Sequence, residues 1–185
     1  MAKKSVLIVF ILTASLGLLS CNQNRLVPAE AEQASQPVME AIFYHHYSVS
    51  LFQFGKIMNK LSLVTHQQDL PYIKGMVDAY DDTNPLFISA LIVNDKETFN
   101  KIVPKDLQEE VIALFNNQKA YISYVETLLE QKDTAKIKKN AGEFANVYKL
   151  ERELNDNRLR NREDLSDYKK SLLQMNKILS KYANH

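Results

Sequence analysis

Few residues of this 185-residue chain have the types and spacing that would support chemistry. His45 and His46 are adjacent, so on a helix their side chains point about 100° apart and do not suit a shared metal ion. The HExxH pattern and the paired Glu-x-x-His pattern of di-iron bundles do not occur in the sequence. We therefore predict no metal site and no cofactor, and a polar contact on a helix surface for either histidine.

A second candidate is acidic. Asp78 precedes Asp81 by three residues and Asp82 by four, so two carboxylates could share a helical turn and hold a cation or a proton. The turn and capping residues that run on to Pro85 explain the same aspartates as a helix end, which we favour. Because GxSxG, P-loop and GxGxxG motifs are also missing from the sequence, we predict no catalytic residues and a protein that is not an enzyme.

A third candidate is the cluster of Arg158, Arg160 and Arg162, because guanidinium groups suit phosphates, carboxylates and lipid headgroups. Acidic residues such as Asp156 and Glu163 flank them, and mixed signs at this density usually form a solvated helix face with local ion pairs. We retain the three arginines as the best polar candidate for partner binding. The best apolar candidate is the aromatic-rich segment 43–54, whose rings occupy more than one helix face and are by default buried.

Composition narrows the class of protein. The chain carries 23 basic and 22 acidic residues, is 45% hydrophobic and 24% charged, and has the length of one domain or two small ones. A disordered chain is excluded by this balance, and a net charge of +1 provides no overall field to attract nucleic acid. The single cysteine, Cys21, excludes an internal disulfide, a four-cysteine zinc site and a CxxC pair.

That cysteine ends a distinctive amino-terminal segment. Lys3 and Lys4 precede an apolar run over 6–19 that would form a helix of roughly 21 Å, too short for the hydrocarbon core of a bilayer. This pattern is typical of a secretory signal peptide. Leu18-Leu19-Ser20-Cys21 also resembles the lipobox of bacterial lipoproteins, although leucine at 19 and serine at 20 are less common choices in that motif.

The resemblance implies that Cys21 is acylated, that the signal peptide of residues 1–20 is removed, and that the lipid bilayer is a partner. Two or more acyl chains anchor a protein firmly, since each buried methylene contributes about 0.8 kcal/mol. Asn22 in place of aspartate implies the outer membrane of the cell envelope if the source has two membranes. Residues 22–36 are polar and lack aromatic residues, so we expect 21–36 to be a lipidated cysteine with a flexible tether.

The remaining residues, 37–185, are predicted to be helical almost throughout, because apolar residues recur every three or four positions. We expect a first helix near 37–66, short helices within 70–103 and a helix over 107–128. Over 134–183 either one long helix or two fit, and we favour two that meet near Asn155-Asp156-Asn157. The stripes that carry these predictions are Phe43, Tyr47, Ser50, Phe54, Ile57, Leu61 and Val64; Leu107, Val111, Leu114, Gln118, Tyr121, Val125 and Leu128; and Leu165, Tyr168, Leu172, Met175, Leu179 and Tyr182.

The sequence thus predicts an all-α, antiparallel helical bundle, compact or elongated, with coiled-coil-like packing after a cleaved signal peptide and tether. The favoured function is a non-enzymatic interaction or adaptor domain on a membrane-anchored envelope lipoprotein, with an envelope protein as its partner. One alternative is an immunity- or inhibitor-type lipoprotein that binds a toxin or an enzyme. The other is an enzyme or small-ligand carrier, in which Ser50, Gln118, Arg158 and Asn161 would line a cavity in the bundle.

Overall fold

The computed structural model describes the backbone of residues 29–83 and 86–183, and the side chains of residues 35–82 and 87–183. The predicted signal peptide and Cys21 lie outside these ranges. The chain divides into two units, Met1–Gln36 and Pro37–His185. The hydrophobic core lies in the second unit.

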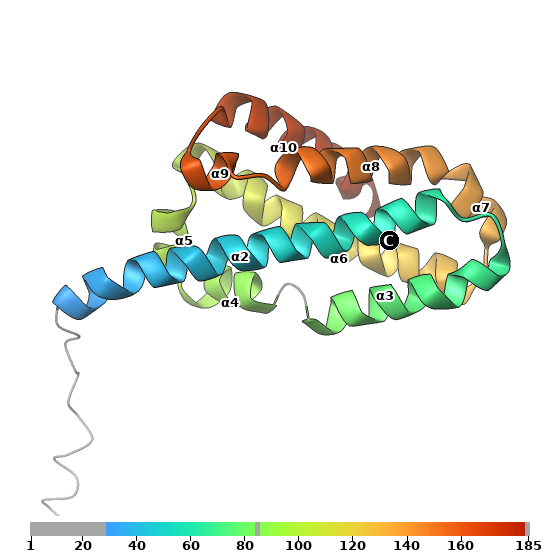
Figure 1. The fold of residues 1–185 in the computed structure, drawn as a ribbon, viewed down its shortest axis with the longest axis horizontal. Helices are drawn as coiled ribbons and strands as arrows, with labels where there is room; N and C mark the ends of the chain where they lie inside the picture. Colours follow the sequence, from blue (N-terminus) through green and yellow to red (C-terminus); the bar gives the residue numbers. More distant parts are fainter. Residues whose placement is uncertain (1–28, 84–85, 184–185) are drawn as a thin grey trace, which may run out of the picture. The chain divides into compact units, whose positions relative to one another are not determined.

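The second unit is an all-α helical bundle, as the periodicity predicts, and the described residues contain no strand (Figure 1). Short loops join most consecutive helices, so sequence neighbours fold back on one another. The helices of the described residues, with the 3-10 turns omitted, are α2 (Ala29–Ser62), α3 (Leu70–Thr83), α4 (Leu86–Asn94), α5 (Lys96–Ile102), α6 (Gln108–Glu130), α7 (Thr134–Lys139), α8 (Ala141–Leu154), α9 (Arg158–Asn161) and α10 (Leu165–Leu179).

Helix α2 begins earlier than the sequence predicts. Its first residue is Ala29 rather than one near 37, and Pro37 lies inside it. Residues 29–36, expected as part of a flexible tether, are therefore helical and belong to the first unit. Alanine, glutamate and glutamine predominate there, and these residues rank among the stronger helix formers. Proline is common in the first turn of a helix, so the prediction took Pro37 as the start of α2. This preference placed the start of the helix too late.

The predictions of short helices within 70–103 and of a helix over 107–128 are confirmed, whereas residues 134–183 form four helices, α7 to α10, instead of the two that we favoured. Residues 70–103 form α3, α4 and α5, and the predicted helix over 107–128 is α6. The C-terminal stripe is interrupted at 155–157, and the short α9 separates α8 from α10. Arg162 and Asp164, at the end of α9 and the start of α10, adopt left-handed backbone angles with φ of 60° and 44°, which reverses the chain.

The core is built by the predicted stripes. Every member of the α2 stripe and of the α6 stripe is buried, including the two polar residues Ser50 and Gln118. Helix α6 packs on α10 and α3, and α10 packs on α8. In Figure 1, α2 crosses the bundle between α8 and α3, and hydrogen bonds from Ser48 to Asn155 and between Ser50 and Tyr80 join it to these neighbours. Helix α2 therefore presents one face to the core and one away from it.

Candidate functional site

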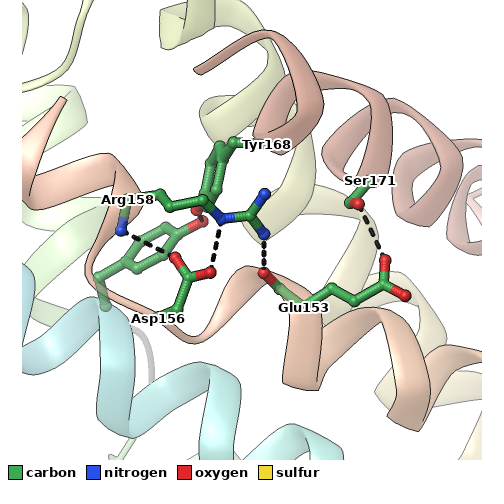
Figure 2. A network of polar contacts seen from close by, with 6 residues as sticks. Glu153, Asp156, Arg158, Tyr168 and Ser171 are labelled. Carbon is green, nitrogen blue, oxygen red and sulfur yellow. Dashed lines mark hydrogen bonds and ion pairs between the residues drawn. The ribbon is translucent and has the colours of Figure 1, made fainter. Parts of the chain in front are cut away.

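The arginine stretch contains one residue held by the bundle and two that are exposed. The Arg158 Nε donates to Asp156 Oδ2 at 2.6 Å, and its Nη2 donates to the main-chain carbonyl of Glu153 (Figure 2). Its guanidinium also lies 5.6 Å from the centre of the Tyr168 ring. Arg158 thus ties the end of α8 to α9 and α10, which leaves Arg160 and Arg162 as the exposed members of the cluster.

Neighbouring polar contacts fix the same corner. The Ser171 hydroxyl on α10 donates to the Glu153 carboxylate on α8 at 2.9 Å, as Figure 2 shows. The hydroxyls of Tyr168 and Tyr47 lie 2.5 Å apart and join α10 to α2, and burial raises the pKa of both tyrosines. The α8–α9–α10 corner is consequently a rigid support for the exposed residues beside it.

A polar cleft of about 300 Å³ lies between this corner and α2. Ser48 and Asn155 form one wall through reciprocal hydrogen bonds, with the Ser48 hydroxyl donating to Asn155 Oδ1 at 2.6 Å and the Asn155 amide donating to the Ser48 carbonyl at 3.1 Å. The cleft is lined by Ala41, Tyr44, His45, Tyr47, Ser48, Asn155, Asp156, Asn157, Leu159 and Arg160. It therefore offers both signs of charge, amide groups and tyrosine rings within a small volume.

The floor of the cleft is tightly held. The Tyr44 hydroxyl is positioned to donate to the carbonyl of Ile102 at 3.3 Å and to that of Leu159 at 3.4 Å, so one side chain links α2 to α5 and α9. Burial raises the pKa of Tyr44, with the carboxylate of Glu40 adding to the effect. Tyr44 is therefore a neutral hydrogen-bonding group at neutral pH. The other ionisable side chains that line the cleft are those of His45, Asp156, Arg160 and the buried Tyr47.

His46 and the acidic candidate Asp78 have structural partners. The His46 ring stacks on Phe87 of α4 with centroids 4.8 Å apart, whereas His45 is exposed at the cleft. Asp78 pairs with Lys74 at 2.7 Å along α3. Within the described part of the chain no three His, Cys, Asp or Glu side chains are grouped in a way that could hold a metal ion.

The two polar residues of the core stripes are brought together. The hydroxyls of Ser50 and Tyr80 lie 3.4 Å apart, and the Tyr80 hydroxyl donates weakly to Gln118 Oε1 at 3.5 Å. Burial raises the pKa of Tyr80 to about 12. Of the other residues proposed for an internal cavity, Arg158 is held by the contacts described above and Asn161 is exposed. The four residues therefore do not form one cluster.

Sequence reasoning missed a buried carboxyl group. Glu151 on α8 is 1% exposed and packs against Gly55 of α2, where a side chain would have no room. The Asn155 amide donates to Glu151 Oε1 at 2.9 Å, while Oε2 has no partner among the described residues. Burial raises the pKa of this carboxyl group. The sequence contained one signal for this burial: Glu151 occupies a position in the helical apolar series Phe144, Val147, Glu151 and Leu154.

A tyrosine cluster was also not anticipated. Glu143 accepts hydrogen bonds from Tyr121 at 3.0 Å and Tyr182 at 2.7 Å, and it pairs with Lys181 at 3.4 Å. The Tyr182 ring lies 4.8 Å from that of Tyr121 in an edge-on arrangement. These contacts fasten the C-terminal turn to α6 and α8, so we assign the cluster a structural role.

Comparison of the chain with profiles of known protein families, with curated proteins and with solved structures finds no match. In the described ranges, none of the helices combines the length and apolar character needed to cross a bilayer. The class that fold and site together define is an all-α bundle with a polar surface cleft.

Proposed function

We propose that this chain is a lipid-anchored protein of the bacterial cell envelope whose helical domain binds another envelope protein and is not an enzyme. The support for the anchor is the lipobox-like segment that ends at Cys21. A tethered domain of this kind meets its partners at a high effective concentration, so a small binding surface suffices.

The observation that carries the binding role is the polar cleft beside the α8–α9 corner. Arg160 is exposed at its edge, and its guanidinium can make charge-assisted hydrogen bonds with a carboxylate of a partner. Tyr44 and Tyr47 are only 7% and 4% exposed and form the floor of the cleft, so Arg160, a residue type enriched among those that dominate interface energies, is the main contact offered to a partner. Because the supporting side chains are fixed by hydrogen bonds, little ordering is needed on binding.

The binding role is tested by crosslinking in the producing cells. A photoreactive residue replaces His45 in the full chain, and irradiation is expected to yield one protein adduct. Arg160→Glu should abolish this adduct and Arg160→Lys should retain part of it, because only the former reverses the charge. Lys170→Glu is the matched control, since Lys170 is exposed on α10, outside the cleft lining. An adduct that survives Arg160→Glu, or that is lost equally in the control, would contradict the role of the cleft.

The anchor is tested separately by fractionation. Cys21→Ser should release the protein from membranes or leave the precursor uncleaved, because the acylated side chain is missing. Deletion of 158–162 should leave membrane association intact, since the anchor does not involve the arginine stretch. Unchanged processing and membrane association in the Cys21 variant would refute the lipoprotein assignment.

A further inference from the structure

A hollow of about 640 Å³ lies where α6 ends and α3 begins, at the end of the bundle that carries α7 (Figure 1). It shares no lining residue with the polar cleft of the α8–α9 corner. Its volume is in the range typical of small-molecule sites. We name it the end pocket, and its lining includes the apolar Leu70, Pro71 and Leu129 and the basic His66, Lys74 and Lys132.

The floor of the end pocket is apolar. Leu70 on α3 is 3% exposed and Leu129 on α6 is 4% exposed, so both belong to the core and present only the edges of their side chains to the pocket. Pro71 adds an exposed ring at the rim. Because the free energy of apolar contact scales with the area removed from water, this floor suits a short apolar chain better than a long acyl chain.

The charge on the pocket wall has one sign. Within the described residues, the lining of the end pocket contains no carboxylate, and Glu126 and Glu130, which act on Lys74 electrostatically, lie outside it. Lys74 pairs with Asp78 at 2.7 Å, but an exposed pair of this kind contributes little, so the ammonium is available to a ligand at low cost. Lys132 takes part in none of the ion pairs in the same part of the chain.

Lys132 has an unusual backbone conformation. It follows the last turn of α6 with a left-handed φ of 51°, and its N–H donates to the carbonyl of Leu129 at 3.1 Å. Glycine is the usual residue where a helix ends in this way, because a side chain makes the left-handed conformation less favourable. A lysine therefore occupies a position at which glycine would be more stable. Such conformations are concentrated at binding sites, where a side chain is kept for its function.

The turn that forms the opposite wall is fixed by its own hydrogen bonds. Asp69 Oδ2 accepts the backbone N–H groups of Thr65 at 3.3 Å and of His66 at 3.0 Å, and the Thr65 hydroxyl lies 2.8 Å from His66 Nδ1. The Asp69 carboxylate is thus engaged within the turn, and it lines a neighbouring groove instead of the end pocket. A wall held in this way needs little ordering when a ligand binds.

We infer that the end pocket binds a small carboxylic acid with a short apolar chain. The ammonium groups of Lys132 and Lys74 make charge-assisted hydrogen bonds with the carboxylate, and Leu70 and Leu129 lie under the apolar chain. A ligand with only one of these two parts leaves either the lysines or the apolar floor without a partner. The site is independent of the proposed anchor and of the partner-binding cleft, because it shares no residue with either.

Photolabelling of the full chain in its native membranes tests the site. The probe is an octanoic acid derivative that carries a diazirine on its chain, and its methyl ester is the control that lacks the charge. Irradiation with the acid is expected to label peptides that contain 70–74 or 129–132, as mass spectrometry of a digest would show. Unlabelled octanoate should compete with the probe, whereas octanol should not, because octanol offers no charge to the lysines.

Lys132→Gly separates binding from folding. It should lower the labelling about tenfold, because a charge-assisted hydrogen bond is lost. It should also raise the melting temperature of the purified chain by about 2–4 °C, because glycine adopts the left-handed conformation without cost. Lys132→Arg keeps the charge and should retain most of the labelling. Lys170→Ala is the matched control, because Lys170 is exposed on α10 and does not line the pocket, so this variant should label like the wild type.

Three results would overturn the proposal. Labelling by the methyl ester that equals labelling by the acid, or equal competition by octanol, would show that the carboxylate is not recognised. Equal labelling of the Lys132→Gly and Lys170→Ala variants would show that the probe binds elsewhere. A Lys132→Gly variant that loses both the labelling and thermal stability would show that Lys132 supports the fold and is not kept for a ligand.

Discussion

Gly55→Ala probes a close approach of α2 to the Glu151 side chain of α8. A Cβ atom at this position would lie 2.3 Å from Glu151 Oε2 and 2.6 Å from its Cδ, well inside van der Waals contact. The Glu151 carboxyl group is buried and held by Asn155, so it has little freedom to withdraw. Overpacking of this kind lowers the free energy of unfolding by about 1–3 kcal/mol, and alanine in place of a helical glycine returns about 1 kcal/mol. We expect a net loss of up to about 2 kcal/mol.

A double-mutant cycle isolates the energetic contribution of the contact between residue 55 and Glu151. In a Glu151→Ala background the obstructing carboxyl group is gone, so Gly55→Ala should raise the free energy of unfolding by about 1 kcal/mol instead of lowering it. The difference between the two backgrounds, about 1–3 kcal/mol, is the overpacking contribution. Urea unfolding followed by circular dichroism measures all four proteins, with unchanged m-values as the check on two-state behaviour.

Gly75→Ala is the control for helix propensity. Its Cβ would meet no atom within 4 Å, so this variant should gain up to about 1 kcal/mol in either background. If Gly55→Ala behaves like Gly75→Ala, or if the effects of the Gly55 and Glu151 substitutions add to within about 0.5 kcal/mol, the close contact between α2 and α8 is refuted.

Three further predictions concern single side chains. Burial raises the folded-state pKa of Glu151, so the free energy of unfolding of the wild type falls as pH rises above the unfolded-state pKa of about 4.5. Glu151→Gln should therefore become more stable relative to the wild type as pH rises above about 4.5 in urea titrations, and a pH-independent difference would count against this. Arg158→Ala should lower the free energy of unfolding by about 1–3 kcal/mol, because Arg158 is hydrogen-bonded within the bundle. Arg160→Ala should change it by less than about 0.5 kcal/mol, because Arg160 is exposed. Thermal melts measure both variants, and equal losses would contradict the different contacts of the two arginines. Gln118→Met replaces a buried amide whose Nε2 lacks a hydrogen-bond partner among the described residues, so it should raise the free energy of unfolding by about 1 kcal/mol. A clear loss of stability in the same thermal melts would show that the amide does have a partner.

Helical periodicity was enough to predict the fold class and most of the core. The stripes of α2 and α6 are buried at every predicted position. Apolar residues that repeat every three or four positions form one face of a helix, and that face is stable when it packs in the core of the bundle. The interruption at 155–157 was also visible, since asparagine and aspartate compete with the helix for backbone hydrogen bonds. The start of α2 was misplaced because Pro37 dominated the local pattern.

The candidate site was only partly accessible from the sequence. The cluster Arg158, Arg160 and Arg162 could be found by composition, but the division into one internally bonded and two exposed arginines depends on where Asp156 and Tyr168 lie in space. The cleft joins residues of α2 and α9 that are more than 100 positions apart, and no local pattern encodes that proximity. The exposure of Phe52 was visible in the sequence only as aromatic residues on more than one helix face, because periodicity alone does not say which face the bundle covers.

Intact mass of the protein extracted from its native envelope, before and after mild base treatment, tests the central proposal most directly. The lipid-anchor account predicts the mass of residues 21–185 plus acylglyceryl groups, with a loss of ester-linked acyl chains after base. A mass that matches the unmodified full chain, or residues 21–185 without lipid, would contradict it.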